Sequence, residues 1–353
     1  MIYSDISDFY HYTIDSQHTG LTMRRVLHVG PCSTPGGMSK VIEILSQNPP
    51  DGWVAETLQS HIVSNPIAKY FFHRGAIKQF IQIITGEKKP DVVHIHTAAD
   101  WSWKRKSTYV SLCKQYNVPC ILHIHSGNFV NWLGKQNSQR CQTFRKATAS
   151  EKCRVVVLND AWKEEIEPLI GDCQAINNPI DPLLRFDENM IRQERQILFL
   201  GRDDPVKGRK FAVDLFRELK ATKYPNLKMY MSGKDDENST SGIESKKWFS
   251  EEEKLRLLQQ SSLILMPSKY EGQSLVMLEA LHCGLPCIIS DTVLDLPESV
   301  VAAKHDDLDD WIEKVSHALE NTTDGKLLNQ AVSNHQIDQI NQQWKTLYYD
   351  LRS

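Results

Sequence analysis

Two pairs of charged residues in the second half of the chain have types and spacings suited to holding a sugar diphosphate. Arg202 and Lys207 share one short loop after an apolar run, and Glu271 and Glu279 lie around the start of a helical pattern. Two cations in one loop can clamp a diphosphate, because arginine offers a planar fork of donors and lysine a mobile charge. A carboxylate can accept hydrogen bonds from sugar hydroxyls. The alternative interpretation is a solvated loop with two surface cations, followed by an acid in a first helical turn and a surface glutamate.

The segment between the two glutamates predicts a seat for phosphate. Ser274 can cap a helix over residues 275–282, and Gly284 with Pro286 ends that helix. The free N–H groups and partial positive charge at a helix N-terminus favour a bound anion. Gly272 allows a ligand to approach the backbone closely.

A glycine-rich loop follows the first apolar run of the chain. Residues 30–40 read GPCSTPGGMSK, with Gly36 and Gly37 directly before a helical pattern. The loop lacks both the Gly-Lys-Ser/Thr of a Walker A sequence and the G-x-G-x-x-G of a dinucleotide fingerprint. It is therefore either a turn that faces a ligand or an ordinary connection from strand to helix.

Two histidine pairs end two of the apolar runs. His94 with His96, and His123 with His125, each have the spacing that puts two side chains on one face of a strand. Such pairs can chelate a metal and support a metal-dependent hydrolase as an alternative function. No H-E-x-x-H or H-x-x-E-H motif accompanies them. The other interpretation of each residue is a buried imidazole with satisfied hydrogen bonds.

A short segment mixes aromatic and basic side chains. It contains Trp101, Trp103, Lys104, Arg105 and Lys106. This composition is typical of a contact with an anionic membrane surface, where each cation can add about 1 kcal/mol. The alternative is the solvated start of a helix.

The elements that position these residues follow an alternating pattern, which predicts an α/β fold with parallel sheets. We expect strands at residues 25–30, 54–58, 91–96, 119–125, 154–158, 196–201, 226–231, 263–266 and 286–290. We expect helices at residues 38–45, 107–116, 210–220, 251–260, 274–282 and 337–351. The alternation of strands and helices is interrupted at the turn-rich segment 177–182 and continues after it. We therefore predict two Rossmann-like, doubly wound domains that face a central cleft.

This pattern divides the chain into four predicted segments. Residues 1–22 are a polar N-terminal extension, residues 23–178 a first Rossmann-like domain and residues 179–335 a second. Residues 336–353 form a C-terminal helix that packs back on the first domain. Because ligands of open α/β sheets bind outside the carboxyl ends of the strands, we expect the charged pairs to line the cleft.

Composition excludes several classes of protein. The net charge of −3 and the pI of about 6.5 provide no basic field for nucleic acid. The 8 cysteines form no C-x-x-C pair, which predicts mostly buried thiols in a reducing, cytoplasmic setting. No apolar run reaches the ~18 residues of a membrane span, and the first 22 residues lack the apolar core of a signal peptide.

The charged motifs together resemble a known family. Glu271 to Glu279, within EGQSLVMLEAL, resembles the E-x7-E signature of retaining glycosyltransferases of family 4, the group 1 glycosyl transferases of the GT-B fold. Residues 201–208 resemble the family's G-R-x4-K-G element. Residues 178–181, which read NPID, resemble the link before the second domain, with Pro179 in place of the usual glycine. The resemblance extends over nearly the whole chain from Arg25.

This resemblance implies roles for the residues that match it. Arg202 and Lys207 would hold the donor diphosphate, Glu271 the donor sugar and Glu279 the ribose. His125 would contact the donor sugar or the acceptor. The residues implied at the donor are Gly36, Gly37, Gly272, Gln273, Ser274, Leu275 and Glu279. The resemblance implies no metal and no cofactor, and Gln273-Ser274 replaces the Phe-Gly of many members, which leaves the donor sugar open.

The expected function is that of a retaining glycosyltransferase. It would move a sugar from a nucleotide-diphosphate sugar to a hydroxyl acceptor. The acceptor would bind to the first domain and would be a lipid-linked or polysaccharide intermediate of surface glycan biosynthesis. The expected place is the cytoplasm, with peripheral contact to the inner face of the membrane through residues 101–106. The alternatives are the metal-dependent hydrolase, a sugar-nucleotide epimerase of the same fold and a binding module without activity.

Overall fold

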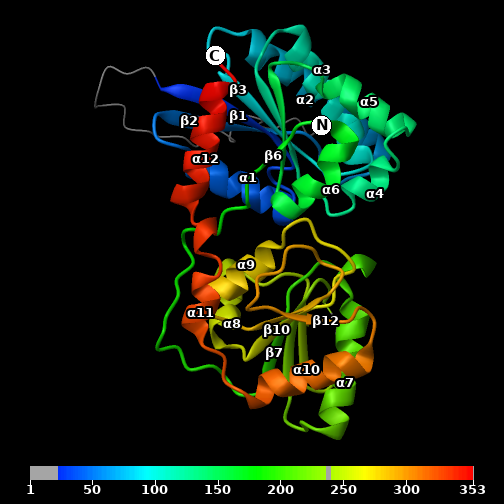
Figure 1. The fold of residues 1–353 in the computed structure, drawn as a ribbon, viewed down its shortest axis with the longest axis vertical. Coiled ribbons are helices and arrows are strands. Elements are labelled where there is room, and N and C mark those ends of the chain that lie inside the picture. The colour runs from blue at the N-terminus through cyan, green and yellow to red at the C-terminus, as the bar shows by residue number, and fades with distance from the viewer. Residues whose placement is uncertain (1–22, 236–239, 353) are drawn as a thin grey trace, which may run out of the picture.

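The computed structural model describes residues 23–235 and 240–352, which form two parallel sheets of six strands each (Figure 1). The first sheet has the order β2-β1-β3-β4-β5-β6 and the second β12-β11-β10-β7-β8-β9. The strands of the first sheet are β1 (Arg24–Gly30), β2 (Trp53–Gln59), β3 (Val92–Thr97), β4 (Cys120–Ile124), β5 (Cys153–Val157) and β6 (Gln174–Ala175). Those of the second are β7 (Gln196–Phe199), β8 (Lys228–Ser232), β9 (Ile243–Lys246), β10 (Leu263–Met266), β11 (Cys287–Ser290) and β12 (Val301–Ala303).

Helices cover both faces of each sheet, as parallel sheets require. Those that follow strands of the first sheet are α1 (Gly37–Gln47), α2 (Pro66–Thr85), α3 (Trp101–Gln115), α4 (Phe129–Leu133), α5 (Gln139–Thr148) and α6 (Asp160–Ile170). The second half contains α7 (Arg209–Thr222), α8 (Glu251–Gln260), α9 (Leu275–His282), α10 (Leu308–Glu320) and α11 (Gly325–Gln330), with short 3₁₀ turns at Pro205–Lys207 and Ser333–His335. The chain ends in α12 (Ile337–Asp350).

The central strands of both sheets are buried on both faces, and apolar residues make up most of their sequences. β3, β4, β7, β10 and β11 have every residue buried. In the first sheet, Val93 and Ile95 face one apolar core, while Val92 faces a second core on the other side. The predicted α/β architecture with two doubly wound sheets is confirmed.

The C-terminal helix α12 lies beside the first sheet, far in sequence from the strands that it covers (Figure 1). Its buried side chains include Trp344 and Tyr348, which pack in one apolar cluster with Val26 of β1 and Trp53 of β2. The rings of Trp53 and Tyr348 lie with their centroids 4.9 Å apart. The last helix thereby ties the end of the chain to the first half, while the domain limits assigned from the sequence remain a prediction.

The predicted elements are present, and the structure adds others. Each predicted strand overlaps an observed one, and β10 and α8 have the bounds predicted for them. The sequence analysis did not identify α2, α4, α5, α6, α10, α11, β6, β9 or β12. The eight cysteines are free and seven are buried, which confirms the prediction of mostly buried thiols. The predicted extension 1–22 lies outside the described residues, and no helix within them is long and apolar enough to cross a bilayer.

Candidate active site

Lys207 and Glu271 meet at the carboxyl edge of the second sheet. Lys207 Nζ lies 2.6 Å from Glu271 Oε1 and 2.8 Å from Oε2, so the ammonium group bridges the carboxylate. Gly208 permits this approach, because its φ of 69° suits glycine and a Cβ there would overlap the carbonyl oxygen of Pro267. Lys269 N also donates to Val206 O at 2.8 Å, which fastens the two loops to each other. The structure therefore joins two of the residues predicted for the site.

Glu279 is buried within α9 and forms an ion pair that the sequence analysis missed. Its side chain is 5% exposed, and its Oε1 lies 3.1 Å from Lys254 Nζ of α8. Burial raises the pKa of Glu279, against the opposing effect of Lys254. Burial alone would lower the pKa of Lys254, but Glu279 and Glu251 raise it, so the lysine stays charged. The alternative interpretation of Glu279 as a surface residue is therefore wrong.

Two helix N-termini face each other between the sheets. Ser274 caps α9, since its side chain accepts a hydrogen bond from Met277 N, as predicted. Gly36 is the N-cap of α1, and an ideal Cβ on Gly37 would lie 3.9 Å from Leu275 Cδ1 at the start of α9. The glycine-rich loop and the start of α9 thus converge from opposite halves of the chain. The N–H groups of both helices are placed to favour an anion between them.

The two halves also approach each other closely at the loops that follow β4 and β10. A Cβ on Gly127 would overlap the carbonyl group of Glu271, and a Cβ on Gly272 would overlap the carbonyl oxygen of His125. Trp162 Nε1 donates a hydrogen bond to Gly272 O. Only a residue without a side chain fits at either glycine, so the sequence fixes how near the Glu271 loop comes to the first sheet.

Gln273 connects the same loop to the segment between the two halves. Its Oε1 accepts from Asn178 N at 2.6 Å, and its Nε2 donates to Asn177 Oδ1 at 2.8 Å. Lys40 of α1 forms a second connection, with its Nζ 2.8 Å from Asp181 Oδ2. The Gln273 side chain is therefore engaged by the linker, and what it offers a ligand is its backbone.

Arg202 stands apart from the Lys207–Glu271 pair. Its side chain is 57% exposed and lies 4.0 Å from Asp204 Oδ2. Among the described residues it forms no ion pair with Glu271. An exposed, weakly held guanidinium at the end of β7 is free to reorient toward a phosphate.

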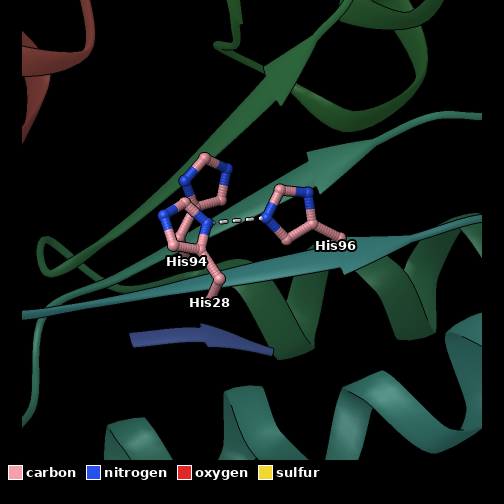
Figure 2. Close-up of side chains that lie close together, drawn as sticks. All are labelled: His28, His94 and His96. Atoms are coloured by element: carbon pink, nitrogen blue, oxygen red, sulfur yellow. Dashed lines mark hydrogen bonds between the residues drawn. The ribbon is translucent and has the colours of Figure 1, made fainter. Parts of the chain in front are cut away.

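The histidine pairs form one buried, hydrogen-bonded group with His28 of β1. His96 Nδ1 lies 2.9 Å from His125 Nε2, and His94 Nε2 lies 3.1 Å from His123 Nδ1. Figure 2 shows His28, His94 and His96 side by side, with His28 Nδ1 and His96 Nε2 3.0 Å apart. Burial lowers the pKa of His28 and of His125 to about 3, and it lowers those of the other three as well. The five rings are therefore neutral at pH 7.

The predicted basic and aromatic surface at residues 101–106 is wrong for two of its members. Trp103 is 5% exposed and packs on Phe144 with ring centroids 4.6 Å apart. Lys106 is fully buried, and its Nζ donates to Ser60 Oγ at 2.6 Å. Both face the interior because α3 turns them toward the first sheet. Trp101 remains 68% exposed, at the outer start of the helix.

One sizeable cavity lies away from these residues. A cavity of about 620 Å³ lies beside the amino ends of β7, β10 and β11, lined among others by Arg192, Ser262, Pro286 and Lys326. Parallel sheets bind their ligands at the carboxyl ends of the strands. The convergence of charged groups and helix N-termini at the carboxyl ends therefore locates the candidate site better than this cavity does.

Comparison with known proteins agrees with this architecture. The model of the family "Glycosyl transferases group 1" matches residues 181–336, which contain Lys207, Glu271 and Glu279. The chain is 24% identical over 234 residues to a glycogen synthase of Mycobacterium tuberculosis, a match that covers 60% of this chain and 55% of the relative. The chain thus spans little more than half the length of that curated relative.

Solved structures with a similar fold cover almost the entire chain. Sucrose-phosphate synthase of Thermosynechococcus elongatus superposes with a TM-score of 0.68 at 16% identity, over 93% of this chain and 99% of that one. WaaG, described as a glycosyltransferase involved in lipopolysaccharide biosynthesis, superposes with a TM-score of 0.64 at 12% identity, over 92% and 98%. Residues 181–336 thus match the group 1 glycosyl transferases, and the two sheets of the chain have the GT-B fold of these solved structures.

Proposed function

We propose that this chain is a retaining glycosyltransferase that moves a sugar from a nucleotide-diphosphate sugar to a hydroxyl acceptor. The observation that supports this most is the joint placement of Lys207, Glu271 and the start of α9 at the carboxyl edge of the second sheet. One cation, one carboxylate and one helix N-terminus provide groups for a phosphate and for sugar hydroxyls in adjacent positions. The family match over residues 181–336 supports the same activity.

The donor diphosphate would occupy the space between the starts of α1 and α9. Lys207 and Arg202 would neutralise the charge that grows on the departing nucleoside diphosphate, which lowers the barrier to breaking the sugar–phosphate bond. Lys207 is shared, because in this structure Glu271 already holds it. Donor binding therefore has to draw Lys207 partly from the carboxylate to the phosphate, and Glu271 is then released for the sugar hydroxyls.

Glu279 would bind the ribose. Lys254 contacts Oε1 of this carboxylate and leaves Oε2 to accept a hydroxyl. Lys254 also lowers the pKa of this buried group against the effect of burial and so favours its ionised form, which is the stronger hydrogen-bond acceptor. The backbone of Gly272, Gln273 and Ser274 would line the sugar, with His125 on the opposite side of the cleft.

The acceptor would approach from the first half of the chain. We propose that this acceptor is a lipid-linked or polysaccharide intermediate of surface glycan biosynthesis, and the fold similarity to WaaG supports such a context. A peripheral membrane contact would use the exposed Trp101 and Lys104, whose Nζ lies 4.6 Å from the centre of the Trp101 ring. The proposed place is the cytoplasmic face of the membrane.

Two single substitutions test this assignment. Glu271→Gln should lower the transfer rate at least ~100-fold, because a group that contacts the reacting sugar is neutralised. It should not weaken binding of the nucleoside diphosphate, since Lys207 loses its competitor. Lys207→Ala should weaken nucleotide binding by about tenfold or more.

The measurements are calorimetric titration with UDP, GDP and ADP, and transfer assays with the matching sugar nucleotides. Glu298→Gln and Lys210→Ala, both exposed, are the matched controls. Unchanged turnover in Glu271→Gln would remove this residue from the site. Equal nucleotide affinity in Lys207→Ala would remove the phosphate clamp.

A further inference from the structure

The buried histidine cluster is a second chemical feature, which the proposed transfer reaction does not use beyond His125. The parallel register places His28 opposite His94, and His96 opposite His123, on adjacent strands. Alternation along each strand then directs these rings to one face of the sheet. His125 extends the row past the end of β4. The cluster thus runs from beneath α12 to the loop that touches Gly272.

Three of these histidines each bring one nitrogen close to the other two. One nitrogen each from His96, His123 and His125 lie within 4.8 Å of one another. His96 Nδ1 and His125 Nε2 are 2.9 Å apart, and His123 Nε2 is buried without any hydrogen-bond partner. A buried polar nitrogen without a partner is costly, and it indicates that a partner is missing from the protein atoms alone.

The remaining histidines act as an outer layer around these three. His96 turns its other nitrogen, Nε2, to His28 Nδ1 at 3.0 Å, and His123 turns Nδ1 to His94 Nε2 at 3.1 Å. His94 Nδ1 in turn lies 2.9 Å from the Tyr348 hydroxyl on α12. If each inner ring donates its N–H outward, the nitrogens left for the centre carry lone pairs. Metal-binding histidines are oriented in this way by an outer shell of acceptors.

We propose that His96, His123 and His125 bind a zinc ion that fixes the end of β3 and β4 beneath the cleft. Three neutral imidazoles suit zinc, which takes nitrogen at about 2.0–2.1 Å in tetrahedral geometry and leaves a fourth position for water. That geometry needs the His96 and His125 nitrogens to separate by only a few tenths of an ångström from their hydrogen-bonded distance.

The role of this ion is structural. None of the described acids belongs to the histidine groups that converge there, so the site holds no carboxylate that would act as a general base for hydrolysis. The ion would hold the loop that contains His125 at the position where the carbonyl oxygen of His125 faces Gly272. The inference does not depend on the proposed transfer activity, because it concerns only the first sheet and α12.

The test is the zinc content and thermal stability of the full chain. The protein is stripped with EDTA, incubated with ZnSO₄, desalted and measured by mass spectrometry for zinc per chain. Cobalt(II) loading should give the visible absorption of a tetrahedral site. We expect one zinc per chain and a rise in melting temperature with added zinc, since an ion bound only to the folded state stabilises it.

Three variants make the result specific. His125→Gln changes a partly exposed ligand and should lower zinc affinity at least ~100-fold while the chain still folds. His123→Gln should do the same, and His317→Gln, on the exposed side of α10, should bind zinc as the natural chain does. Less than a tenth of an equivalent of zinc in the natural chain would overturn the proposal, as would full zinc binding by His125→Gln. Nucleotide titrations in EDTA report separately on the proposed function, which they test whatever the zinc result.

Discussion

The buried ion pair between Glu279 and Lys254 gives the sharpest prediction for stability. Replacement of Lys254 by Met removes the cation and leaves the Glu279 carboxylate, 5% exposed, without its partner. Loss of one partner of a buried pair typically costs 3–5 kcal/mol. Because the Lys254 side chain is 17% exposed and water can reach it in part, we expect about 3 kcal/mol. For a domain of this size that corresponds to a fall in melting temperature of roughly 6–12 °C.

The pH dependence of this loss has a defined sign. The folded-state pKa of Glu279 is already raised by burial, and without Lys254 it should rise further. A raised pKa means that the folded state binds more protons than the unfolded chain, so stability falls as pH rises through the folded pKa. The deficit of Lys254→Met against the natural chain should therefore be larger at pH 8 than at pH 5.

The assay is thermal melting of the natural chain, Lys254→Met and the double variant Lys254→Met with Glu279→Gln. The double variant should recover most of the lost stability, because no buried charge remains. Lys246→Met is the matched control, since Lys246 pairs with Glu253 at 2.6 Å but on the exposed surface, where pairs contribute little. If Lys254→Met melts within 1 °C of the natural chain at pH 8, or the double variant is no better than the single one, the reasoning is refuted.

Two other substitutions probe the first half of the chain. Lys106 is fully buried, and burial lowers its pKa from 10.5 to about 7. Between pH 7 and pH 10.5 this lysine is therefore mostly neutral in the folded state and mostly protonated in the unfolded chain. The free energy of unfolding of Lys106→Met should therefore exceed that of the natural chain at pH 7, and this difference should shrink by about 3 kcal/mol by pH 10. Urea titrations that show no such convergence would contradict this. Gly127→Ala should lower kcat/KM about tenfold or more, because the added Cβ would push the Glu271 loop away from the first sheet. The circular dichroism spectrum should stay unchanged. An unchanged kcat/KM would show that the close approach of this loop is unimportant.

Much of the fold was predictable because its determinants are local. β10 is a run of four apolar residues between Ser262 and Pro267. α8 begins after Ser250, whose side chain accepts from Glu253 N while the Glu253 carboxylate accepts from Ser250 N. Such signals lie within a few neighbouring positions. By contrast, α2 was missed because its first half carries exposed apolar residues such as Ile67 and Phe71, which blur the amphipathic period.

Partners distant in sequence were the part that the sequence did not reveal. Lys254 lies on α8 and Glu279 on α9, so no spacing rule connects them. A glutamate inside an apolar helix does signal that a cation is needed, but not which one. The error at residues 101–106 was avoidable, because Trp103, Lys106, Val110 and Cys113 follow the helical period and all face the core.

The most direct test of the donor site is calorimetric titration of the EDTA-treated protein with UDP, GDP and ADP, compared between the natural chain and Glu279→Gln. The account predicts that one of the three nucleotides binds without any metal and that Glu279→Gln binds it about tenfold more weakly, because the variant loses the charged acceptor for the ribose. No binding of any nucleotide by the folded natural chain, or equal affinity in Glu279→Gln, would contradict it.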